Sequence, residues 1–147
     1  MRLRELLLAG LVATLVGAAG AAVAQSMSPD QREALDAAEK WLVPVDAGRY
    51  QDAWAMASEQ LKSLVARDKF RDGLRDIRGK YGKLVSRTGE KMGYVGEPPT
   101  PEGELKEGLK VVILFATRFA GDKAATEEMT MVYEKDRIWR AASYYIR

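Results

Sequence analysis

The chain has 147 residues, contains neither cysteine nor histidine, and carries a net charge of +2. The missing thiol and imidazole exclude cysteine nucleophiles, serine–histidine pairs and imidazole bases. The nearly neutral charge gives no global electrostatic reason to bind nucleic acid. No segment matches a glycine-rich phosphate loop or a calcium-binding loop. We therefore expect no cofactor and no metal, and carboxylate or lysine chemistry is what remains for catalysis.

The beginning of the chain has the three parts of a secretory signal. Arg2 and Arg4 form a positively charged start, an apolar run occupies residues 6–16, and Ala22 and Ala24 place small side chains at the −3 and −1 positions of a cleavage site. An uncleaved anchor is the alternative, because this stretch is just long enough to span a bilayer. The glycines in its second half and the lack of a positive flank after it favour cleavage.

Cleavage after Ala24 divides the chain into a signal peptide, residues 1–24, and a single domain, residues 25–147. A domain of this size can bury one core without disulfides. Loss of two arginines and one glutamate lowers the net charge from +2 to +1. We expect the mature protein to be exported from a bacterial cytoplasm, to reside in the periplasm, and to keep no transmembrane segment.

A long helix is predicted at the start of the domain. The sequence Ser-Pro-Asp-Gln at 28–31 is typical of a helix start, with Ser as N-cap, Pro at the first helical position and Gln three residues after the cap. Pro44 is expected to bend or end this helix, and Gly48 to cap it. Its apolar stripe at helical spacing consists of Leu35, Ala38, Trp41, Leu42 and Val45.

Two further helical segments follow. The pattern predicts a short helix over 50–57, which continues after a break near Ser58 to about residue 65. Another helix is predicted to open at Asp68 and to close at Gly82. One face of that last helix carries Phe70, Leu74, Ile77 and Tyr81.

The second half of the chain predicts four strands. A weak strand over 85–95 contains two glycines, which suggests an edge strand or a bulge, and the proline-rich segment 97–104 is a loop. Strands over 109–119, 126–135 and 138–146 are joined by short turns. One predicted face of these strands carries Val111, Ile113, Phe115, Thr117, Phe119, Met129, Met131 and Tyr133. The order indicates an α+β domain, with N-terminal helices packed on one face of a four-stranded antiparallel meander.

Several segments resemble an exported bacterial family, domain of unknown function 4019. They are Trp41-Leu42, Val45-Asp46-Ala47-Gly48, Tyr50, Trp54, Leu84-Val85-Ser86-Arg87, Ile138-Trp139-Arg140 and Tyr144-Tyr145-Ile146. The resemblance covers nearly all of the mature chain, although Pro44 and Ser143 depart from its pattern. The order and size of the elements also resemble the nuclear-transport-factor-2-like and cystatin-like cone folds, in which helices close over a curved sheet and leave a pocket. That likeness implies a fold and carries no function.

Aromatic side chains are the first candidate ligand-binding feature. In a cone fold, some of them line an apolar pocket for a small molecule. A domain this small also needs aromatic side chains for its core, and burial is the reading we favour for any single one. The candidates for pocket or core are Trp41, Trp54, Phe115, Tyr133 and Trp139.

A basic stripe on the last predicted helix is a candidate interaction surface. Arg71, Arg75 and Arg78 recur at helical spacing and could face an anionic envelope component. Acidic residues at pairing distance, such as Asp68 and Asp72, favour a solvated helix face instead.

Carboxylates give no clear catalytic candidate. Glu127 and Glu128 are neighbours on a strand and point to opposite faces, so they cannot act as a pair. Asp46 and Asp52 lie near helix ends, where we expect them to cap or to pair. We therefore lean against an enzyme and predict no catalytic residue.

These observations favour a non-catalytic accessory domain of the bacterial envelope. The leading hypothesis is a module that binds an envelope protein or an anionic envelope component. The alternatives are a carrier of a small apolar ligand in the cone pocket and a carboxylate-dependent enzyme. A closed apolar pocket favours the carrier, and a buried carboxylate facing a tyrosine hydroxyl in an apolar cone favours the enzyme. A filled cone beside an exposed basic or apolar patch favours the interaction module.

Overall fold

The computed structural model describes residues 27–147, so the predicted signal peptide lies outside the described residues. Four helices come first: α2 (Pro29–Asp46), α3 (Tyr50–Met56), α4 (Glu59–Leu64) and α5 (Arg67–Tyr81). Four strands follow: β1 (Leu84–Val95), β2 (Lys110–Phe119), β3 (Lys123–Tyr133) and β4 (Trp139–Ile146). The strands form one antiparallel sheet in the order β1-β2-β3-β4, which confirms the predicted α+β meander.

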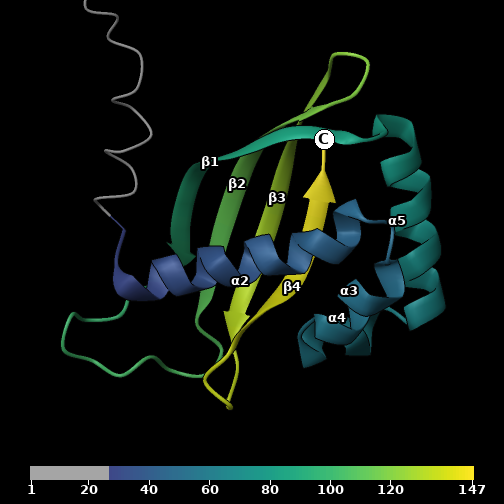
Figure 1. Cartoon of the computed structure of the whole chain (residues 1–147). Helices are drawn as coiled ribbons and strands as arrows, with labels where there is room; N and C mark the ends of the chain where they lie inside the picture. The colour runs from purple at the N-terminus through teal and green to yellow at the C-terminus, as the bar shows by residue number, and fades with distance from the viewer. Residues whose placement is uncertain (1–26) are drawn as a thin grey trace, which may run out of the picture.

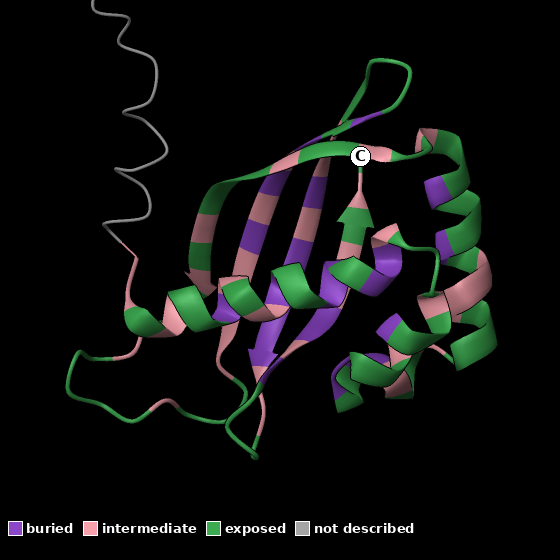
Figure 2. Ribbon diagram, in the orientation of Figure 1, coloured by how far each residue is buried: buried purple, intermediate pink, exposed green. Residues whose placement is uncertain are grey.

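The helices cover a single face of the sheet. Figure 1 shows α2 crossing in front of the strands, with α3, α4 and α5 grouped beside the β4 end of the sheet. Burial follows this layering, because the purple bands of Figure 2 alternate along β2 and β3 with half-buried positions. The core therefore sits between α2, the shorter helices and the inner face of the sheet.

The start of α2 is fixed by its own sequence. The Ser28 side chain accepts a hydrogen bond from the Gln31 backbone, and the Gln31 side chain accepts one from the Ser28 backbone, which completes a capping box. Pro44 lies inside the helix, and the helix ends two residues later, at Asp46. Gly48 follows with a φ of +73°, a left-handed conformation that glycine adopts without strain. The helix end places Asp46 beside the sheet.

Strand β1 is an edge strand with two irregularities, as its glycines predicted. The register with β2 shifts between Leu84 and Ser86 and again between Gly89 and Lys91. Strand β3 begins earlier than predicted, since Lys123 already pairs with Phe119. The turn between β2 and β3 is therefore shorter than the predicted strand bounds, 109–119 and 126–135, imply.

Apolar side chains fill the space between the layers. Trp41 and Leu42 of α2 pack against Phe115 of β2 and against Met129 and Met131 of β3, all of them at most 2% exposed. The Trp41 ring also contacts Tyr144, with the ring centroids 5.5 Å apart. At about 25 cal/mol per Å² of buried apolar area, such a cluster is the main source of stability in a domain of this size.

Candidate functional site

Two regions of the domain gather polar groups around buried positions. The first is a buried ion network of Asp46, Arg78, Arg87 and Glu127, joined by the hydroxyls of Thr117 and Tyr144. The second is a groove between α2, the end of α3 and the start of β4, called the α2–β4 groove below. In the network, all four carboxylate oxygens accept hydrogen bonds within the domain, although Arg78 Nε has no partner among residues 27–147. At the groove, the unpartnered group is the indole nitrogen of Trp139, which lies beside exposed apolar side chains.

Glu127 lies at the centre of the buried ion network and is 0% exposed. Arg87 grips its carboxylate with two nitrogens, Nε at 2.5 Å and Nη2 at 3.0 Å. The Thr117 hydroxyl donates to Oε2 at 2.5 Å, and the Tyr144 hydroxyl donates to Oε1 at 2.5 Å. Both carboxylate oxygens therefore accept two hydrogen bonds each, which uses the four acceptor sites that a carboxylate offers.

Asp46 ties the end of α2 to the same network. Arg87 donates to both of its oxygens at 2.7 and 2.9 Å, and Arg78 donates to Oδ1 at 2.9 Å. Two carboxylates thus face two guanidinium groups, and the network is neutral overall. Because bidentate arginine–carboxylate pairs hold a fixed geometry, this network joins α2 and α5 to β1 and β3.

The pKa values in the network follow from this pairing. Burial alone would raise the pKa of Asp46, but hydrogen bonds and charge attraction from Arg87 and Arg78 hold that pKa below its ordinary value. Burial raises the pKa of Tyr144, and the adjacent Glu127 carboxylate raises it further. Burial would lower the pKa of Arg87, but its two carboxylate partners raise it. Asp46 is therefore ionised and Tyr144 stays a hydrogen-bond donor across the physiological range.

A fully bonded carboxylate is poorly placed for general-base catalysis. A base must present a free lone pair within hydrogen-bond reach of the substrate proton. Glu127 does face the Tyr144 hydroxyl, as the enzyme hypothesis requires, but two nitrogens of Arg87 and the Thr117 hydroxyl occupy the rest of its acceptor sites. This arrangement stabilises the fold by electrostatic pairing.

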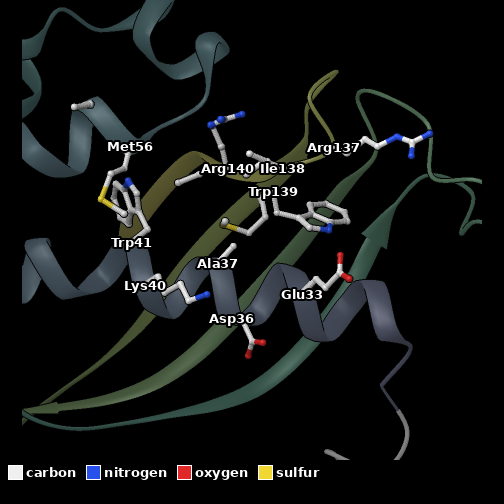
Figure 3. A pocket seen from close by; sticks show the side chains of 13 residues that line it. Glu33, Asp36, Ala37, Lys40, Trp41, Met56, Arg137, Ile138, Trp139 and Arg140 are labelled. Atoms are coloured by element: carbon white, nitrogen blue, oxygen red, sulfur yellow. The ribbon is translucent and has the colours of Figure 1, made fainter.

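The α2–β4 groove is open to solvent and has a volume of about 590 Å³. One wall comes from α2, the opposite wall from the start of β4 and the turn before it, and the end wall from α3, as Figure 3 shows. Its lining includes two exposed apolar side chains, Met56 and Ile138, which are 45% and 49% exposed. Trp41 and Trp139 complete the apolar part of the lining.

Trp139 is the one tryptophan of the chain whose indole has no partner among the described residues. Trp41 donates its indole Nε1–H to the carbonyl of Ala53 at 2.8 Å, and Trp54 donates to the carbonyl of Val65 at 2.8 Å. Trp139 is 5% exposed, and its Nε1–H makes no hydrogen bond in the described part of the chain. A buried, unsatisfied donor costs about 1–3 kcal/mol, so such a group calls for an explanation.

The charged side chains of the groove divide into paired and unpaired sets. Arg140 is held by Asp136 in a bidentate contact at 2.8 and 2.7 Å. On the α2 wall, Glu33, Asp36 and Lys40 form no ion pair with any residue in 27–147. Figure 3 shows the Glu33 carboxylate turned to the side of the groove where the Trp139 indole nitrogen lies.

The structure separates the five aromatic candidates. Trp41 and Trp139 both line the α2–β4 groove, and Tyr133 packs behind Trp139 with the ring centroids 5.2 Å apart. Phe115 is 1% exposed and belongs to the core. Trp54 lies apart from the groove lining, where Lys62 and Arg67 approach its ring at 5.8 and 5.4 Å.

The three arginines of the basic stripe lie in two different environments. Arg71 pairs with Asp68 and Asp72, and Arg75 pairs with Asp72, as the solvated-face reading predicted. Arg78 is 5% exposed and belongs to the buried ion network, so its assignment to an interaction surface was wrong. Helical spacing placed the three side chains close together, but the side chain of Arg78 is turned inward by Asp46 and by the ring of Phe119.

Sequence reasoning missed the central roles of Arg87 and Glu127. The alternation that put Met129 and Met131 on the inner face also puts Glu127 there, and this was the available signal. Asp46 and Asp52 pair near helix ends as predicted, Asp52 with Arg49 at 3.0 Å. Glu128 points to the other face and pairs with Arg147 at 2.8 Å. Within residues 27–147, no group of three acidic residues is arranged to hold a metal ion.

Comparison with known proteins identifies the family. The model of a family described as "Protein of unknown function (DUF4019)" matches residues 37–144. The chain belongs to this family. No curated protein and no solved structure matches the chain. The family match spans all six residues of the buried ion network, whereas Glu33 and Asp36 of the groove precede it.

Among the residues that the structure describes, no helix is both long enough and apolar enough to cross a bilayer.

Proposed function

We propose that this domain is a non-catalytic binding module of the bacterial envelope and that the α2–β4 groove is its binding surface. The observation that carries the proposal is the unpartnered indole of Trp139 at a groove with exposed apolar side chains. Binding sites combine apolar lining with a few polar groups that fix orientation. Export to the periplasm is the part of this proposal that rests on the N-terminal sequence alone.

The interior supports binding at the surface over binding within the fold. Large apolar side chains occupy the space between helices and sheet, and the buried carboxylate of Glu127 is fully bonded. A carrier with its ligand inside the cone would need part of that space. A groove of about 590 Å³ lies in the range of small-molecule sites, so an apolar small molecule is the alternative occupant of the groove.

An anionic envelope component is the less supported candidate for the partner. The arginines that could attract it are paired with Asp68 and Asp72, or, in the case of Arg78, buried. Paired charges cancel most of each other's field beyond a Debye length of about 8 Å. Envelope association of an Arg71→Ala/Arg75→Ala variant, measured by cell fractionation, should therefore equal that of the wild type.

Site-specific photo-crosslinking in the source cell tests the groove. A benzophenone amino acid replaces Ile138 at the rim of the groove in one strain, and in a second strain it replaces Leu64, which is 72% exposed but lies outside the groove. We expect adducts from position 138 and none from position 64. Equal adducts from both positions, or none from position 138, would refute the groove as the binding surface.

A further inference from the structure

We infer that the occupant of the α2–β4 groove is an extended polypeptide segment of another protein, which pairs with the free edge of β4 at Trp139. This inference rests on the proposed function and names the class of partner. Strand β4 is the last strand of the sheet, so one side of it has no neighbouring strand. Such an edge presents backbone donors and acceptors to an added strand.

The backbone of Trp139 points to that free edge. Trp139 lies opposite Tyr133 of β3. Tyr133 donates its N–H to Leu109 at 2.9 Å and accepts from the N–H of Gly108 at 2.8 Å, so both of its backbone groups point to the β2 side. Opposite residues in an antiparallel pair either exchange both bonds or none. The N–H and C=O of Trp139 therefore point away from β3.

The same edge of β4 already accepts a backbone hydrogen bond two residues after Trp139. The backbone N–H of Ser58 donates to the carbonyl of Ala141 at 2.9 Å. Ala57 and Ser58 are extended, with φ/ψ of −74°/168° and −65°/157°, so they lie at the edge of β4 in the manner of a very short strand. Trp139 lies two residues before Ala141, so its backbone groups point to the same edge, and it lies within the groove. An added segment would therefore continue the line that Ala57 and Ser58 begin.

The side chains of the groove indicate which segment fits. The Trp139 indole N–H is buried without an acceptor, and a peptide carbonyl supplies one once the ring turns toward the occupant. Met56 and Ile138 offer contact to an apolar side chain. The unpaired carboxylates of Glu33 and Asp36 outnumber the unpaired Lys40 on the α2 wall, so this wall favours a cation. An apolar side chain and a lysine or arginine two residues apart would lie on the same face of an extended segment and meet both.

Amide hydrogen exchange with defined peptides tests this inference. The probe is a pool of synthetic, end-capped seven-residue peptides with Leu, Ile or Phe at the third position and Lys at the fifth, added to the intact protein. We expect a member of the pool to slow exchange of the Trp139 backbone amide at least about tenfold, because that amide becomes hydrogen-bonded. The amide of Arg118, on an interior strand and far from this edge, serves as the internal reference. If no member slows exchange at Trp139, the inference is wrong.

Backbone methylation of the binding peptide distinguishes strand pairing from side-chain contact. N-methylation removes one amide donor at a time. We expect methylation at every second position to weaken binding at least about tenfold and methylation at the intervening positions to leave it nearly unchanged, because only one edge of the peptide faces β4. Equal effects at both sets of positions, or no effect at either, would contradict pairing with β4.

Matched variants test the side-chain part. Glu33→Gln/Asp36→Asn should weaken binding of the lysine-containing peptide, whereas Glu39→Gln, on the same helix but outside the groove lining, should not. Trp139→Phe should weaken binding about fivefold, the worth of one hydrogen bond, and should leave the unliganded fold intact. Equal affinity for all of these variants would overturn the assignment.

The two proposals fail in different ways. Position 138 could crosslink to a small molecule, or to a protein whose isolated segments do not protect the Trp139 amide. Either result would support the groove as a binding surface and refute the extended segment as its occupant. Absence of crosslinks from position 138, together with protection of Trp139 by peptides in vitro, would retain strand pairing as a property of the edge and remove the groove as the site used in the cell.

Discussion

The buried ion network and the α2–β4 groove each contain a buried nitrogen without a hydrogen-bond partner among residues 27–147, but in different surroundings. In the network, Arg78 Nε lies among paired charges, and each oxygen of Glu127 and Asp46 accepts at least one hydrogen bond from within the domain. At the groove, the indole N–H of Trp139 lies beside exposed apolar side chains. Paired charges fix a structure, whereas an unsatisfied donor beside an apolar groove fits recognition. Function is therefore to be sought at an unsatisfied group that borders an exposed apolar surface, rather than at the most charged cluster.

The largest expected effect comes from opening the network. Arg87→Met leaves Glu127 and Asp46 without their shared partner in the interior. We expect the free energy of unfolding to fall by about 3–5 kcal/mol, because a buried charge loses its compensation. Urea denaturation measures this. The control, Arg118→Met, breaks an exposed pair with Asp122 and should change stability by at most about 0.5 kcal/mol. Similar losses in both variants would show that the network does not fasten the fold.

The two groove tryptophans provide the next comparison. Trp41→Phe and Trp139→Phe remove the same atoms, but only Trp41 loses an existing hydrogen bond and leaves the carbonyl of Ala53 unpaired. We expect Trp41→Phe to be the more destabilising of the two by about 1–3 kcal/mol. Thermal or urea unfolding of both variants checks this difference. An equal cost would mean that the indole of Trp139 is satisfied in solution.

The third prediction concerns alkaline pH. The folded-state pKa of Tyr144 is raised above its ordinary value of 10.0 by burial and by Glu127. Its contribution to stability is therefore complete below pH 10.0 and is lost as pH rises above that value toward the higher folded-state pKa. We expect Tyr144→Phe to reduce the alkaline loss of stability measured by urea unfolding between neutral pH and pH 11.

The smallest effect on stability is expected at the groove rim. Ile138 is 49% exposed, so Ile138→Asp should change the free energy of unfolding by at most about 0.5 kcal/mol. The same change places a charge against the apolar lining and should abolish crosslinking from a benzophenone at position 56, in the end wall of the groove. Retained crosslinking in the Ile138→Asp protein would show that the partner does not bind in this groove.

Local sequence signals were sufficient for the helices and for the order of the strands. The capping box at Ser28 and the glycine at position 82 mark helix ends by themselves, and alternation identified the buried face of β2. The start of β3 was misplaced because Lys123 joins the sheet through pairing with Phe119, a contact that its own neighbours in sequence do not encode.

The site was harder to predict because it depends on contacts distant in sequence. Arg87 and Asp46 lie 41 positions apart, and no local pattern distinguishes Arg87 from the exposed arginines around it. Glu127 could have been placed on the inner face by alternation, but its four donors come from three different elements. The unpartnered indole of Trp139 is still less visible in sequence, since satisfaction of a donor depends on every neighbour in space.

The indole region of a nitrogen–proton correlation spectrum is the most direct test of the groove as the recognition surface. The three tryptophan indoles of the folded protein are observed before and after addition of an extract of the source cell's envelope. We predict that the Trp139 resonance moves while that of Trp54, which lies outside the groove and is bonded to Val65, stays in place. Movement of the Trp54 resonance as large as that of Trp139 would mean that the change is not confined to the groove, and an unmoved Trp139 resonance would contradict the groove as the recognition surface.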